Sequence, residues 1–87
     1  MSPSSTSAGT VRAELTTFLE QRTGTVVAGD LDLFAGGLVS SLFALELVVF
    51  LESTFGVVVG GPDLRLDNFR TVDAMTALVQ RLGGGDG

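Results

Sequence analysis

Cysteine, histidine, lysine, tyrosine and tryptophan are all absent from this chain of 87 residues. Without cysteine, the chain can form neither a disulfide nor a thiolate metal site. Without histidine, it lacks the commonest metal ligand and the usual general base near neutral pH. These absences argue against an enzyme, so we expect a protein with no catalysis of its own.

Positive charge and long apolar runs are also scarce. Five basic residues face ten acidic ones, for a net charge of −5, and no basic stripe that could bind nucleic acid is present. The longest nearly apolar run, residues 42–51, contains Glu46 and is far shorter than the roughly 20 residues of a membrane span. Residues 1–7 have no basic side chain and no apolar segment, unlike a signal peptide. We expect a monomeric, cytoplasmic protein that binds neither nucleic acid nor membrane.

What the chain does contain is helical periodicity. Apolar residues recur at helical spacing over residues 11–22, 41–55 and 72–82. A short helix is also predicted near residues 67–69. The predicted fold class is therefore all-α, a small bundle of three long helices plus one short helix, with a long loop between the first two long helices.

Residues with known preferences for helix ends mark the boundaries of these helices. Thr10, Ser40 and Thr71 each precede a periodic segment, and their hydroxyls are suited to cap the first-turn amides. Gly24 and Gly56 follow the first two segments, where glycine commonly ends a helix.

The remaining segments are predicted to be irregular. Residues 1–9 are rich in Ser, Thr, Pro and Gly and predict a disordered lead. Residues 83–87 predict a flexible Gly-rich tail, which leaves residues 10–82 as the folded domain. The loop at 23–39 is unusually long for a compact domain, a feature that often accompanies function. Residues 57–59 are β-branched but lack a partner strand, so we expect an extended loop.

The helix predicted at residues 41–55 has two apolar faces. One face is expected to join the core and consists of Ala44, Leu47, Val48, Leu51 and Phe55. The opposite face carries Leu42, Glu46 and Val49, with Phe43 and Phe50 on its flank. Exposed apolar residues of this kind favour a docking surface, although Phe43 and Phe50 have the alternative of packing under the loops.

Two serines, Ser40 and Ser41, stand at the predicted start of this helix. Neither can be a serine-hydrolase nucleophile, because the chain has no histidine and no Gly-x-Ser-x-Gly turn. The loop acids Asp30 and Asp32 are expected to be solvated, not catalytic. The free amides and the dipole at a helix start would tolerate a phosphate on Ser41. The serines are thus either plain helix-start residues or acceptors of a group attached by another enzyme.

At these residues the sequence resembles the acyl carrier protein family. The matching segment is Gly37-Leu38-Val39-Ser40-Ser41-Leu42, followed by Glu46-Leu47 at the family's spacing. The likeness extends over residues 11–82, with Phe55-Gly56 at a helix end and Phe69-Arg70-Thr71-Val72 before the last helix.

The resemblance implies a carrier of acyl groups. A separate Mg²⁺-dependent phosphopantetheinyl transferase would attach 4′-phosphopantetheine from coenzyme A to Ser41, which the register with Leu42 and Glu46 favours over Ser40. The thiol of this arm would hold an acyl group as a thioester and present it to an acyl-loading enzyme and to downstream synthase or tailoring enzymes. The family's docking positions correspond to Leu42, Glu46, Val49 and Glu52.

The chain departs from the family pattern in two respects. Ser40 stands where the family has Asp, and the helix carries few acids besides Glu46 and Glu52. We therefore expect packing on Phe43, Val49 and Phe50 to matter more for docking than charge does.

The pathway is expected to belong to secondary metabolism. The sequence is similar to discrete carriers of actinobacterial polyketide and antibiotic pathways, including carriers of three-carbon glyceryl or methoxymalonyl units. Two alternatives stay open, an aminoacyl or peptidyl carrier of a nonribosomal pathway and an unmodified helical interaction module.

Overall fold

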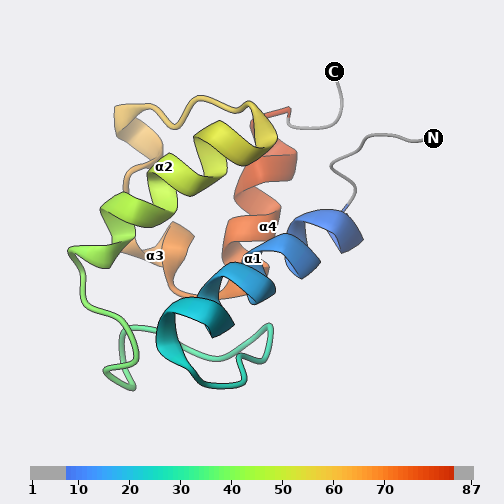
Figure 1. Cartoon of the computed structure of the whole chain (residues 1–87). Coiled ribbons are helices and arrows are strands. Elements are labelled where there is room, and N and C mark those ends of the chain that lie inside the picture. The colour runs from blue at the N-terminus through green and yellow to red at the C-terminus, as the bar shows by residue number, and fades with distance from the viewer. Residues whose placement is uncertain (1–7, 84–87) are drawn as a thin grey trace.

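The computed structural model describes residues 8–83, which fold into four helices (Figure 1). The elements are α1 (Ala8–Thr23), α2 (Phe43–Phe55), a 3₁₀ turn (Gly61–Asp63), α3 (Leu66–Phe69) and α4 (Val72–Arg81). No strand occurs among the described residues. The prediction of an all-α chain with a long connection after its first helix is confirmed.

The helix bounds differ slightly from the predicted ones. α1 begins at Ala8, three residues before the predicted start at residue 11, and therefore includes two residues of the predicted 1–9 lead. The sequence pattern starts only at Val11, which is fully buried, because the exposed residues Gly9 and Thr10 before it carry no periodic signal. The rest of the lead, and residues 84–87 of the predicted tail, lie outside the described part of the chain.

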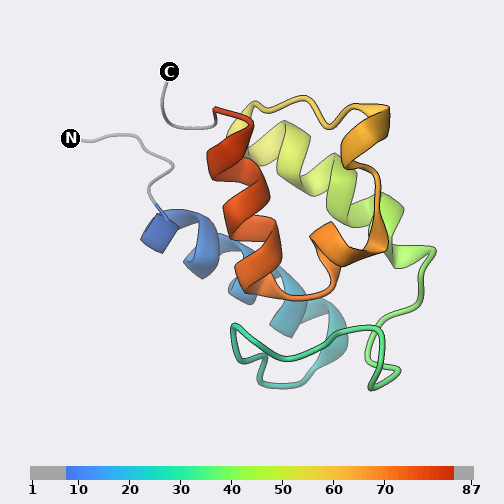
Figure 2. The same cartoon turned by 180° about the vertical axis from the view of Figure 1, so that it is seen from behind.

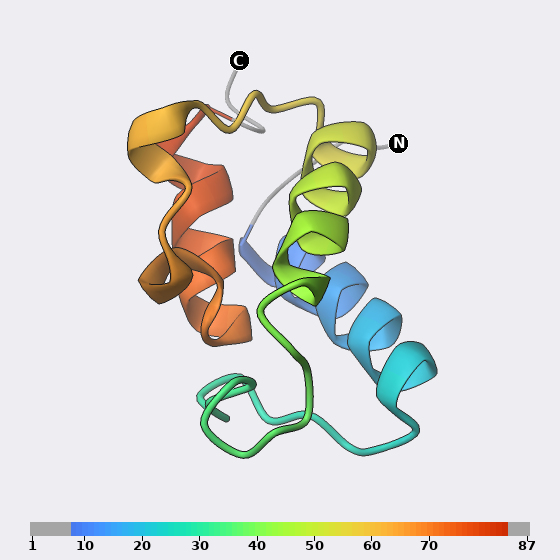
Figure 3. The ribbon, with the colours of Figure 1, turned by 90° about the vertical axis from the view of Figure 1, so that its left-hand side faces the viewer.

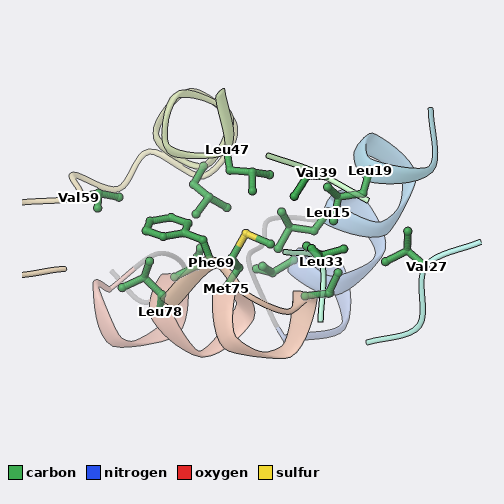
Figure 4. Packing of buried hydrophobic residues seen from close by; sticks show 14 of the residues in the cluster. Leu15, Leu19, Val27, Leu33, Val39, Leu47, Val59, Phe69, Met75 and Leu78 are labelled. Carbon is green, nitrogen blue, oxygen red and sulfur yellow. The ribbon is translucent and has the colours of Figure 1, made fainter. Parts of the chain in front are cut away.

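The helices enclose one apolar core. α1 packs against α4, and the short α3 lies between α2 and α4 (Figures 1 and 3). Figure 4 shows Phe69 of α3 and Met75 of α4 between Leu47 on α2 and Leu78 on α4. All four of these side chains are at most 2% exposed. The four-residue helix α3 is therefore held mainly by the burial of Phe69 and not by its own hydrogen bonds.

The predicted core face of α2 is confirmed in its main features. Ala44, Leu47 and Leu51 are buried, and Val48 and Phe55 are partly buried against the same cluster. α2 thus contributes one face to the core and leaves its other face outside.

α1 and α2 end in the same way. Gly24 has a φ of 72° and its N–H bonds to the Glu20 carbonyl at 2.8 Å. Gly56 has a φ of 69° and its N–H bonds to the Glu52 carbonyl at 3.0 Å. Because this left-handed conformation strains any residue with a Cβ, both positions favour glycine.

The glutamates at these two helix ends also hold the chain that follows. The Glu20 carboxylate accepts the amide of Val27 at 2.9 Å, and the Glu52 carboxylate accepts the amide of Val59 at 2.8 Å. Val27 and Val59 are 4% and 7% exposed, so each bond returns a valine to the core. In the β-branched segment at 57–59, the Val59 amide is thus satisfied by a side chain and not by a partner strand.

The start of α4 is tied to the long loop and to α1. The Thr71 hydroxyl accepts the Ala74 amide at 2.9 Å, which confirms the predicted cap. The Asp73 amide donates to the Gly29 carbonyl at 3.0 Å, and Arg12 pairs with the Asp73 carboxylate at 2.9 Å. As a result, the loop between α1 and α2 runs across the end of the bundle where α4 begins (Figure 2).

Candidate functional site

The two candidate serines lie in a turn directly before α2. The helix begins at Phe43, two residues after the predicted start, and Leu42 occupies the N-cap position with no side-chain cap. The predicted capping role of Ser40 is therefore wrong. The carbonyls of Ser40 and Ser41 already accept the amides of Phe43 and Ala44, at 3.0 and 3.1 Å. Backbone bonds of this turn thus replace the side-chain cap.

The Ser41 side chain is exposed, and its hydroxyl is available for reaction. Within the described residues, neither the Ser41 hydroxyl nor the Ser40 hydroxyl makes a hydrogen bond, and the amides of Ser41 and Leu42 have no partner. Leu42 has helical geometry, with φ −66° and ψ −31°, so its N–H points out of the N-terminal end of α2. The positive end of the helix dipole lies at the same place. The turn is therefore suited to hold a negatively charged group on Ser41.

The serines follow a loop, from Leu33 to Val39, whose two ends are joined by a hydrogen bond. Leu33 and Val39 are 0% and 8% exposed, and the Val39 amide donates to the Leu33 carbonyl at 3.1 Å. Within this loop, Gly37 has a φ of 72° and its amide donates to the Phe34 carbonyl at 3.1 Å. The last anchored residue of the loop, Val39, directly precedes Ser40.

Asp32 organises the beginning of that loop. Its Oδ1 accepts the amides of Phe34 and Ala35 at 3.1 and 2.8 Å, and its Oδ2 accepts from Arg70 at 3.3 Å. The Leu33 amide donates to the Arg70 carbonyl at 2.8 Å. The hydrogen bond from the Ala35 amide, followed by the bonds from Arg70 and Phe34 to the carboxylate, lowers the pKa of Asp32 below its ordinary value. Asp32 is therefore partly exposed to solvent, as expected, and also holds the loop through these bonds.

The outer face of α2 carries an apolar stripe. Leu42, Leu45 and Val49 are 75%, 64% and 63% exposed. Leu42 and Val49 were predicted to face partners, whereas Leu45 was missed. Its position three residues after Leu42 and four before Val49 is the helical-spacing signal by which it could have been found.

The two predicted docking phenylalanines pack against α1. The ring of Phe18 lies 6.0 Å from Phe43 and 4.2 Å from Phe50 between centroids. The Arg22 guanidinium lies over the Phe18 and Phe43 rings, at 4.9 and 5.7 Å, and pairs with Glu46. Both phenylalanines are half-buried, so only part of each side chain is available to a partner.

Two shallow apolar grooves flank α2. The larger, of about 360 Å³, lies against α1 and is lined by Phe18, Arg22, Leu45, Glu46, Val49 and Phe50. The smaller, of about 150 Å³, lies against α3 and the segment before it, and its lining includes Ala44, Leu45, Val48, Leu64, Arg65 and Phe69. Leu45 contributes to both grooves and is thus the ridge between them.

The two acids predicted for docking already have partners in the fold. Glu46 pairs with Arg22, and the Glu52 carboxylate holds the Val59 amide. Contacts of Glu52 with a partner would compete with this hydrogen bond. On this face, exposed apolar area is therefore more available for recognition than free charge is.

The described residues offer little other chemistry. Within residues 8–83, no group of three or more acidic side chains is placed to hold a metal ion. None of the helices in this part of the chain is both long enough and apolar enough to cross a membrane.

A scan against protein-family models finds no match, and a search of curated proteins also finds none.

Proposed function

We propose that this chain is an acyl carrier protein whose Ser41 holds a 4′-phosphopantetheine arm. The observation that carries the proposal is the exposed, unbonded Ser41 hydroxyl in the turn that leads into α2. The resemblance of the segment from Gly37 to Leu42 to the family's serine box supports the same residue.

The chemistry at Ser41 would be a phosphoryl transfer catalysed by a separate enzyme. The Ser41 Oγ would lose its proton and form the new bond to phosphorus, while the pyrophosphate bond of coenzyme A would break and adenosine bisphosphate would leave. The chain has no histidine to act as the base for this step, so the separate enzyme would supply it. Its own contribution is an accessible hydroxyl, with the Ser41 and Leu42 amides and the α2 dipole next to the new phosphodiester.

When bound, the arm supplies the thiol that the cysteine-free chain lacks. The stripe of Leu42, Leu45 and Val49 follows Ser41 along α2 and is suited to dock the transferase and the enzymes that load and use the acyl group. Acyl groups of secondary metabolism, such as three-carbon units, are the proposed cargo.

The proposal is tested by intact mass spectrometry after incubation with coenzyme A and a promiscuous phosphopantetheinyl transferase. The wild-type chain should gain one phosphopantetheinyl group. The Ser41→Ala variant should gain none, and the neighbouring Ser40→Ala variant should gain one like the wild type. An unmodified wild-type chain, or a group that survives Ser41→Ala, contradicts the proposal.

A second candidate is an unmodified helical interaction module. It is favoured by the same exposed stripe, because three large apolar residues on one helix face suit a protein partner with or without an arm. This candidate predicts partner binding that is indifferent to Ser41→Ala but sensitive to Leu45→Ala. An aminoacyl carrier, the remaining alternative, predicts loading of the modified chain by an adenylating enzyme.

A further inference from the structure

The ion pair of Asp32 and Arg70 joins two distant parts of the chain. The Arg70 Nη1 lies 3.3 Å from the Asp32 Oδ2, and the backbone bond from Leu33 to Arg70, at 2.8 Å, runs beside it. Arg70 also pairs with Asp67 of α3 at 3.0 Å. The long loop is thereby fixed to the corner between α3 and α4, next to the buried Phe69.

A short series of contacts leads from this ion pair to Ser41. Leu33, fixed by Arg70, accepts the Val39 amide at 3.1 Å, and Val39 is the residue before the two serines. At the other end of the loop, Asp32 holds the amides of Phe34 and Ala35. The segment from Asp32 to Val39 is thus held at both of its ends, and Ser40 and Ser41 follow it directly.

Helix α2, on the other side of the serine turn, is fixed independently of the loop. Leu47 and Leu51 are fully buried, so α2 and its exposed stripe are positioned by the core and not by the loop. The serine turn is attached to α2 on one side, because the Ser40 and Ser41 carbonyls accept the Phe43 and Ala44 amides. On its other side the chain enters from Val39, so the loop sets the direction in which the chain enters the turn.

We propose that Asp32 and Arg70 are positioning residues for the modification of Ser41: they hold the serine turn in the orientation that a transferase docked on α2 requires. This inference rests on the proposed function of Ser41. Neither residue touches the reacting atoms, and each acts through the loop that precedes the turn.

The proposal predicts a specific kinetic signature in the transferase reaction. Asp32→Ala removes both the ion pair and the acceptor for the Phe34 and Ala35 amides, while the docking stripe on α2 stays intact. The rate kcat should fall about tenfold or more, since a misplacement of about 1 Å can cost up to about 100-fold, and KM for the carrier should stay unchanged. Simple loss of folded protein predicts the reverse, because a smaller folded fraction raises the apparent KM and leaves kcat unchanged.

Three further variants complete the experiment. Asp32→Asn keeps an oxygen that can accept the two amides, so it should recover most of the kcat lost in Asp32→Ala. Arg70→Gln should lower kcat in the same direction as Asp32→Ala. Arg12→Gln breaks a comparable exposed ion pair, that of Arg12 and Asp73 at 2.9 Å, and should keep the wild-type kcat and KM.

The outcomes separate this inference from the proposed function. A wild-type chain that is not modified at all overturns both. A wild-type chain that is modified, with an unchanged kcat in Asp32→Ala and Arg70→Gln, overturns only the positioning role. An equal loss in Arg12→Gln also overturns it, because the effect would then be general. If Asp32→Ala does not fold, the kcat of Arg70→Gln decides.

Discussion

Single hydrogen bonds at helix ends and turns hold much of this structure together, and the Thr71 cap is the simplest to test. Its hydroxyl accepts the Ala74 amide at 2.9 Å at the start of α4. Thr71→Ala leaves that amide without its acceptor and should lower the free energy of unfolding by about 1 kcal/mol. Urea denaturation measures the change. Thr17→Ala, at an exposed position within α1, serves as the control and should not destabilise the chain.

The lowered pKa of Asp32 makes one part of stability depend on pH. The unfolded carboxyl has a pKa near the ordinary 3.8 and the folded one lies below it, with the Ala35 amide as the largest cause. Between the two values the unfolded state binds more protons, so stability rises with pH. The contribution of Asp32 is therefore complete above about pH 3.8 and is lost as the pH falls through the folded value.

A carbon-13 NMR titration of the Asp32 carboxyl tests this directly. The expected midpoint lies below 3.8. In Arg70→Gln the midpoint should rise but stay below that value, because the larger contribution of the Ala35 amide remains. A wild-type midpoint at or above the ordinary value would show that these bonds do not favour the charged carboxylate.

For single residues, the sequence predicts exposure to solvent better than it predicts hydrogen bonds and ion pairs. Spacing alone identifies Leu42 and Val49 as outward-facing, and Thr71 as a cap. It gives no indication that Asp32 pairs with Arg70 or that Glu52 binds the Val59 amide, since both contacts depend on how loops return to the bundle. Ser40 was predicted to be a cap because the pattern cannot distinguish a side-chain cap from a turn closed by backbone bonds.

Among the helices, the shared ending of α1 and α2 gives a prediction about Glu52. Glu52→Ala leaves the Val59 amide, on a 7% exposed residue, without an acceptor. An unsatisfied buried donor costs about 1–3 kcal/mol, and this loss should appear in urea denaturation. Hydrogen exchange at the Val59 amide should also accelerate.

Glu46→Ala on the same helix is the matched control for Glu52. Its ion pair with Arg22 is about half exposed, and such pairs contribute about 0–1 kcal/mol. If the two variants lose equal stability, Glu52 has no special structural role. If Glu52→Ala also weakens partner docking at full folding, the docking role implied by the resemblance applies as well.

The helices themselves follow from local sequence to within a few residues. Val72, Met75, Leu78 and Val79 are all fully buried at the predicted spacing of α4. The bounds at Ala8 and Phe43 could not be predicted, because exposed residues at helix starts carry no periodic signal and the turn before α2 is set by the loop. The repeated use of Glu and Gly at the ends of α1 and α2 is visible in the sequence only once the structure has shown what the glutamates bind.

The stability of the whole molecule depends on a small core. Substitutions of a buried and an exposed leucine of α2, Leu47 and Leu45, test this dependence. Leu47 is 0% exposed and Leu45 is 64% exposed on the same helix. Leu47→Ala should lower the free energy of unfolding by about 2–5 kcal/mol, a large part of the roughly 5–15 kcal/mol of a typical domain. Leu45→Ala should change it by less than about 0.5 kcal/mol.

The same pair separates folding from recognition. Leu45 is the ridge between the two grooves, so Leu45→Ala should weaken transferase or partner binding while leaving thermal unfolding unchanged. A stable Leu45→Ala variant that binds like the wild type would show that the exposed stripe is not the docking surface.

Localising the attached group within the chain tests the carrier proposal most directly. After reaction with coenzyme A and a transferase, cleavage at arginine releases a peptide of residues 23–65, which contains Ser40, Ser41 and Ser53. Fragmentation between Ser40 and Ser41 should place the whole added mass on Ser41. Added mass on Ser40 or Ser53, or no added mass on the wild-type chain, would contradict the account.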